Sequence, residues 1–109
     1  MAGINETRLR GMLGFAMRAG KLIIGTESVC RAMAQDTVKL VLVSFAASDG
    51  AKKKIKTKSE FYNLDCFELP IEAAALGNLI GKSFSPVAIA VTDEGFSHEI
   101  KKALGEETT

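Results

Sequence analysis

The sequence is poor in several residue types that characterise whole classes of proteins. Its 109 residues include no tryptophan, two cysteines, one histidine and two prolines. Cys30 and Cys66 do not form a C-x-x-C pair, and with His98 they supply too few ligands for a tetrahedral zinc site. The same scarcity argues against a disulfide framework and favours a reducing cytosol as the natural compartment.

Long apolar runs are also missing from the sequence. No stretch approaches the roughly 20 apolar residues that a membrane-spanning helix needs. Near the N-terminus, Glu6, Arg8 and Arg10 interrupt the apolar residues, whereas a signal peptide carries a continuous apolar segment. We therefore expect a cytoplasmic protein with no membrane partner.

The composition is that of one folded domain. The chain is 47% apolar and 25% charged, which fits a globular protein and not a disordered one. Its length leaves no room for a second core. We expect residues 1–104 to form a single domain and residues 105–109 to form a frayed acidic tail.

Helix and strand patterns alternate along the chain. Apolar residues at helical spacing predict helices over residues 6–19, 27–35, 48–62, 71–80 and 95–104. Short apolar runs of β-formers predict strands over residues 21–24, 38–45, 65–69 and 87–91. The expected helix N-caps are Asn5 and Thr26, and the expected helix stops are Gly20 and Gly81. This alternation indicates an α/β fold with helices on both sides of a small central sheet.

Positive and negative charges are concentrated in different halves of the chain. Residues 1–58 hold eleven lysines and arginines against four acidic residues, a net charge of +7. Residues 59–109 hold three against nine, a net charge of −6. Such asymmetry predicts a face that attracts polyanions, although it weakens if the two halves interleave in the fold.

Five lysines are clustered in the third expected helix, at positions 52, 53, 54, 56 and 58. Helical spacing places Lys52 and Lys56 on one face of the helix, and Lys54 and Lys58 on another. The like charges of each pair repel one another, and a bound polyanion would reduce this repulsion. The alternative is a solvated helix face. Aromatic residues do not interleave with these lysines, so we expect no base stacking there.

The patterns typical of catalysis are weak. His98 is the sole imidazole and falls on the expected exposed side of the last helix. Asp93 and Glu94 are better explained as residues that lead into that helix and favour its positive end. Residues 77–83 resemble a phosphate-binding loop, but three residues separate the glycines where four are required. We therefore expect no enzyme.

The start of the second expected helix carries a mixed polar group. Gly25 permits close approach of a nucleic acid, and Thr26, Glu27 and Ser28 follow it with side-chain groups and free N–H groups. Arg31 falls on the same helix face. Donors, acceptors and a cation together suit recognition of base edges and phosphates. The alternative is simple capping with an internal Glu27–Arg31 ion pair.

Most of the chain, about residues 9–104, resembles the kink-turn RNA-binding ribosomal protein family, which includes large-subunit ribosomal proteins seven-Ae and thirty-e. The likeness is closest to the small bacterial YlxQ-like members. The segments that carry it, in order, are AMRAGK at 16–21, GTE at 25–27, KLVLV at 39–43, LGNLIGK at 76–82 and VAIAVTDEGF at 87–96. The resemblance implies a single-domain, three-layer α/β/α sandwich with a mixed central sheet. It also implies binding of structured RNA without enzymatic activity, cofactor or metal.

The sequence departs from the family at its recognition motif. Family members that bind kink-turns typically carry Gly-Thr-Asn-Glu-x-x-Lys, in which Asn and Glu read guanine edges. Here Glu27 stands in place of Asn, Ser28 in place of Glu, and Arg31 retains the positive charge. A carboxylate cannot donate a hydrogen bond as an amide does. The sequence therefore predicts RNA binding and leaves kink-turn selectivity open.

The resulting hypothesis is a translation-associated protein that binds ribosomal or other structured RNA. The candidate RNA-binding residues are Lys21, Gly25, Thr26, Glu27, Ser28, Arg31, Leu69, Pro70, Ile71 and Lys82. Leu69, Pro70 and Ile71 are included because the resemblance implies a second RNA-contact region before the fourth expected helix. The rival hypothesis is a protein-interaction module on the same fold that has lost RNA recognition, with the ribosome or another protein as partner.

Overall fold

The computed structural model describes residues 3–105, in which helices and strands alternate in the predicted order. The expected acidic tail, apart from Gly105, lies outside the described residues. The helices are α1 (Glu6–Arg18), α2 (Thr26–Met33), α3 (Asp49–Phe61), α4 (Ala73–Leu79) and α5 (Glu94–Ala103). The strands are β1 (Leu22–Ile24), β2 (Leu40–Ser44), β3 (Cys66–Leu69) and β4 (Ala88–Val91).

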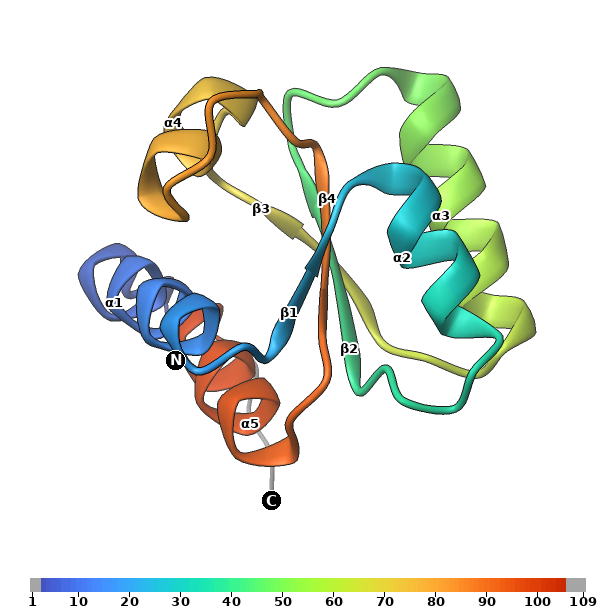
Figure 1. Cartoon of the computed structure of the whole chain (residues 1–109), viewed down its shortest axis with the longest axis horizontal. Coiled ribbons are helices and arrows are strands. Elements are labelled where there is room, and N and C mark those ends of the chain that lie inside the picture. The colour runs from blue at the N-terminus through green and yellow to red at the C-terminus, as the bar shows by residue number, and fades with distance from the viewer. Residues whose placement is uncertain (1–2, 106–109) are drawn as a thin grey trace.

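The four strands form one mixed sheet in the order β1-β4-β2-β3. β4 runs antiparallel to both β1 and β2, whereas β2 and β3 are parallel. Every residue of the two central strands is buried, which explains their continuous apolar sequences. The strand order places the first and last strands of the chain side by side, so segments distant in sequence meet at each end of the sheet (Figure 1).

Helices cover both faces of the sheet, as Figure 1 shows. Leu40 and Leu42 point to the core shared with α1, α4 and α5, while Val41 and Val43 point to the core shared with α2 and α3. This alternation follows from the two-residue period of a strand. The structure therefore confirms the expected three-layer α/β/α sandwich.

Local sequence signals explain most of the element ends. The Asn5 side chain caps α1, and Ser48 caps α3. Gly20 and Gly81 follow α1 and α4 with φ of 72° and 74°, as expected for helix stops. The fourth helix begins at Ala73 and not at Ile71, because the buried Ile71 still belongs to the segment that leaves β3.

The start of α2 differs from the prediction. The N-cap is Gly25 and not Thr26, and Thr26 is already the first helical residue. Gly25 has φ 102° and ψ 143°, a conformation accessible essentially to glycine, and it turns the chain sharply from β1 into the helix. The helix also ends at Met33, two residues before the predicted end, ahead of a left-handed residue at Asp36.

A close backbone contact joins α4 to the segment that leads into β4. A Cβ atom added to Gly77 would lie 2.3 Å from the carbonyl oxygen of Phe84. Only a residue without a side chain permits this packing. Gly77 therefore fixes the path of residues 81–87 over α4, and this path positions the N-terminal end of β4.

We expect Gly77→Ala to lower the free energy of unfolding by about 1–3 kcal/mol, because the added methyl group forces backbone apart. The matched control is Gly11→Ala, since Gly11 lies within α1 and an added Cβ there meets nothing within 4 Å. The control should raise stability by about 0.5–1 kcal/mol through helix propensity. Urea unfolding measures both values, and equal stability of the two variants would contradict this role for Gly77.

Candidate nucleic-acid interface

The first turn of α2 is fixed to the start of β4. The backbone N–H of Gly25 donates to the carbonyl oxygen of Ala88 at 2.9 Å, and the N–H of Val29 donates to the carbonyl oxygen of Gly25 at 2.9 Å. These two bonds hold Gly25 between the sheet and the helix. The orientation of the α2 N-terminus is therefore set by the backbone and not by a flexible side chain.

Within the described residues, no side chain caps the N-terminus of α2. Its first backbone N–H groups thus remain available to an acceptor or anion at the positive end of the helix. Glu27 is exposed, whereas Thr26 and Ser28 are half-buried. The exposed Arg31 directs its guanidinium to Ser28, with 3.4 Å between Nη2 and Oγ. The alternative Glu27–Arg31 ion pair is not among the described ion pairs.

The ends of the neighbouring strands lie at the same edge of the sheet. The N–H of Ser44 donates to Val87 at 2.8 Å, and the N–H of Phe45 donates to Leu69 at 2.9 Å. The buried hydroxyl of Ser44 donates to the carbonyl oxygen of Ile71 at 2.6 Å. Figure 1 shows these chain segments together with the start of α2 at the upper edge of the sheet. Strand spacing places the segment after β3 about 14 Å from the α2 start.

The three predicted contact residues at the end of β3 differ in exposure. Leu69 and Ile71 are buried in the core, so their side chains anchor the segment and cannot reach a ligand in this conformation. Pro70 is half-buried and lines a hollow of about 390 Å³ together with Phe45 and Ile4. In this segment, the side chain offered to a ligand is therefore that of Pro70.

The two predicted RNA-binding lysines, Lys21 and Lys82, come from segments other than the α2 start. The carbonyl oxygen of Lys21 accepts from the N–H of Thr92 at 3.0 Å, at the opposite end of β1 from Gly25. Lys82 lies three residues after the end of α4, where its N–H donates to the carbonyl oxygen of Gly77 at 2.8 Å. The structure therefore brings together the α2 start and the segment at Pro70, but places Lys21 at the other end of the sheet.

Two exposed aromatic residues near this edge were missed by the sequence analysis. Phe45 directly follows β2, and Phe84 lies in the segment before β4. Each stands among small residues outside a predicted helix, as FAA at 45–47 and SFS at 83–85. A large ring in a small-residue turn is the signal that could have identified them.

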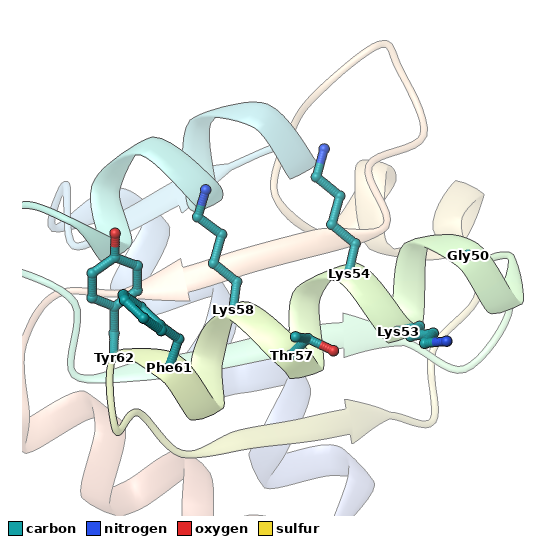
Figure 2. Close-up of a pocket in the computed structure, with 7 residues that line it drawn as sticks. All are labelled: Gly50, Lys53, Lys54, Thr57, Lys58, Phe61 and Tyr62. Atoms are coloured by element: carbon teal, nitrogen blue, oxygen red, sulfur yellow. The ribbon is translucent and has the colours of Figure 1, made fainter.

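The lysine cluster is divided between two sides of α3. Lys52 and Lys56 face the edge strand β3, where the Nζ of Lys52 lies 3.5 Å from a carboxylate oxygen of Glu68. Lys54 and Lys58 instead extend on the side of α3 that faces α2 (Figure 2). α2 and α3 cover the same face of the sheet. Part of the positive charge of residues 1–58 therefore lies on the same side of the sheet as the helix that follows Gly25.

The described residues contain no group of three or more histidine, cysteine, aspartate or glutamate side chains suited to a metal ion. Cys30 is buried, whereas Cys66 is only half-buried because β3 is an edge strand. Burial raises the pKa of the Cys66 thiol above its ordinary value, which disfavours a reactive thiolate.

His98 is exposed on α5. None of the helices in residues 3–105 is long and apolar enough to span a membrane.

Comparisons with known proteins agree with this geometry. Residues 7–101 match the model of the ribosomal protein L7Ae/L30e/S12e/Gadd45 family. The chain is 37% identical over 100 residues to RNA-binding protein YlxQ of Enterococcus faecium, covering 92% of this chain and 94% of the relative. It is 33% identical over 87 residues to large ribosomal subunit protein eL30 of Sulfolobus acidocaldarius, covering 80% and 84% of the two chains.

A solved structure shows the same fold. A protein with unknown function from Bacillus halodurans superposes with a TM-score of 0.83 and 33% identity, covering 91% of this chain and 98% of that one. The matched relatives carry the names of RNA-binding and ribosomal proteins and not of enzymes. The match along nearly the whole chain shows that this protein belongs to the ribosomal protein L7Ae/L30e/S12e/Gadd45 family.

Proposed function

We propose that this protein binds structured RNA in the cytoplasm, as a non-enzymatic component of translation, through the N-terminus of α2. The observation that carries the proposal is the uncapped first turn of α2, held to β4 by Gly25 and flanked by the exposed Arg31. The names of the YlxQ and eL30 relatives support RNA as the ligand and ribosomal RNA as a source.

The first turn of α2 offers three kinds of contact to a folded RNA. Its free N–H groups can donate hydrogen bonds to a phosphate oxygen or to an acceptor atom of a base. The carboxylate of Glu27 accepts hydrogen bonds from the donor edge of guanine or cytosine. Arg31 lies on the same helix face and supplies a cation to a phosphate or a guanine edge. Together they bind an RNA whose bend or loop exposes base edges beside the backbone.

The substitution at the recognition motif sets the selectivity that we propose. In the family motif an amide precedes a carboxylate, whereas here the carboxylate of Glu27 precedes the short hydroxyl of Ser28. One position on a helix changes the direction of a side chain by about 100°. The Ser28 hydroxyl is also occupied by Arg31. The protein therefore binds kink-turns less selectively than members that carry the Asn-Glu pair.

The direct test titrates the purified chain with a kink-turn RNA and with a straight duplex of equal length, at low and moderate salt. We expect measurable binding to both RNAs and a modest preference for the kink-turn, since phosphate contacts alone give salt-sensitive binding without preference. The double variant Glu27→Asn, Ser28→Glu restores the family pair and should increase the preference for the kink-turn by about tenfold or more.

Each outcome of this titration separates the hypotheses. Absence of binding to either RNA, even at low salt, would contradict the proposed function and favour the protein-interaction module. Suppose instead that the wild-type chain and the double variant each bind both RNAs equally well. This result would support RNA binding in general. It would also show that the α2 start does not read base edges.

We further expect Arg31→Ala to weaken structured-RNA binding by about 1–3 kcal/mol, because it removes a cation beside the first turn of α2. The matched control is Arg18→Ala, an exposed arginine at the end of α1 on the other side of the sheet. Fluorescence anisotropy with labelled RNA measures both dissociation constants. Equal affinities of the two variants would remove Arg31 from the site.

A further inference from the structure

A shallow groove that the proposed RNA site does not use runs along the side of α3 turned away from the sheet and toward α2, which we call the outer face of α3. The groove has a volume of about 640 Å³. Its lining residues come from α3 and the residue that follows it, and Figure 2 shows them from the start of the helix to its end: Gly50, Lys53, Lys54, Thr57, Lys58, Phe61 and Tyr62. Methylene stems of lysines and two aromatic rings make this lining mostly apolar.

An exposed aromatic ring closes one end of the groove. Phe61 has 79% of its surface exposed, far more than an aromatic ring that packs in the core. Its ring contacts that of Tyr62 edge to face, with centroids 4.9 Å apart and an interplanar angle of 89°. Tyr62 is itself packed against the core beneath α3, so it supports the Phe61 ring from below. Phe61 thus presents a largely exposed ring that is held by its contact with Tyr62.

Unpaired positive charge lines the rest of the groove. Among the ion pairs of residues 3–105, none involves Lys53, Lys54 or Lys58. Lys54 and Lys58 point in the same direction, one helical turn apart, and Phe61 follows after a further turn (Figure 2). The rise between the two lysines is about 6 Å. The positive charge along this face therefore favours binding of an extended, negatively charged ligand.

The sequence predicts no base stacking at the lysines, because no aromatic residue interleaves with them, but the structure places Phe61 beside them. The aromatic residues follow the lysines in sequence, but one turn of helix brings Phe61 into line with Lys54 and Lys58. A positively charged groove that ends at an aromatic face is the combination that binds single-stranded nucleic acid. An amphipathic peptide helix would instead need several large apolar side chains to pack against along the groove, and the lining offers these only at its Phe61–Tyr62 end.

The groove also begins at the edge of the sheet that carries the proposed RNA site. α3 starts five residues after β2, beside the ends of the other strands, and runs away from that edge in the same direction as α2 (Figure 1). An RNA bound at Gly25 thus has a path along α3 for an unpaired strand that leaves its folded part.

We propose that the outer face of α3 binds a single-stranded segment of RNA, with a base stacked on Phe61 and the backbone phosphates on Lys54 and Lys58. The proposal rests on the proposed function only for the choice of RNA. Its test uses a free single strand, which lacks the folded element read at α2.

The test is fluorescence anisotropy of a labelled oligoadenylate of about ten nucleotides with the full chain at low salt. Phe61→Ala should weaken binding by about tenfold, because it removes the stacking surface. Phe61→Trp should keep wild-type affinity, and its indole fluorescence, unique in a chain without tryptophan, should be quenched by the stacked base. The matched control is Phe15→Ala, since Phe15 is 55% exposed on α1 across the sheet.

The lysines are tested through the salt dependence of the same binding. Lys54→Gln and Lys58→Gln should each reduce the slope of log affinity against log salt by about 0.7, the value for one phosphate contact with a single strand. Lys102→Gln on α5 is the control and should leave the slope unchanged, because Lys102 is exposed on the other side of the sheet.

Two results would overturn the proposal. The first is oligoadenylate binding by Phe61→Ala that equals the wild type. The second is binding of polyglutamate that Phe61→Ala abolishes while oligoadenylate binding is unchanged, which would make the groove a docking site for an acidic protein. The two RNA proposals remain separable, because Arg31→Ala should spare oligoadenylate and weaken structured RNA. If Phe61→Ala weakens oligoadenylate binding but no structured RNA is bound, only the proposed function fails.

Discussion

The hydrogen bond from the Gly25 N–H to the Ala88 carbonyl is the contact on which the candidate site depends. It joins the turn before α2 to the first residue of a fully buried central strand. The same end of that strand is fixed from the other side by Ser44, whose N–H reaches Val87. The α2 start is therefore anchored to the core by backbone hydrogen bonds, although Glu27 and Arg31 are exposed. Binding groups held by a rigid scaffold lose little freedom when a ligand arrives.

Much of the fold could be predicted from the sequence, because its signals are local. The apolar run at 38–45 identifies a buried strand, and the pattern at 87–91 identifies the strand beside it. Asn5 indicates the start of α1 and Gly20 its end through their own backbone preferences. The α2 cap was mispredicted, because a threonine is a common N-cap and nothing local reveals the left-handed conformation of the preceding Gly25.

The arrangement of the site could be predicted only in part, since it depends on the order of the strands. Lys21 is near Gly25 in sequence, yet an extended strand carries the two to opposite ends of the sheet. Pro70 is distant in sequence but lies at the same edge as Gly25, because β1 and β3 run in the same direction and each residue follows the end of its strand. The burial of Leu69 and the exposure of Phe61 are likewise properties of tertiary packing. The helix-start pattern and the family resemblance supplied the candidate residues, and the structure shows which of them lie at the same edge of the sheet.

The central claim is that RNA contacts the α2 start at the edge of the sheet shared by β4 and β2. Amide chemical-shift mapping by NMR, with labelled protein and an RNA that contains a kink-turn, tests it residue by residue. The account predicts the largest shift changes from Gly25 to Arg31, with smaller changes at Val87 and Ala88 through the hydrogen bonds that join them. Changes confined to α1 and α5, with the amides of the first turn of α2 unaffected, would contradict it.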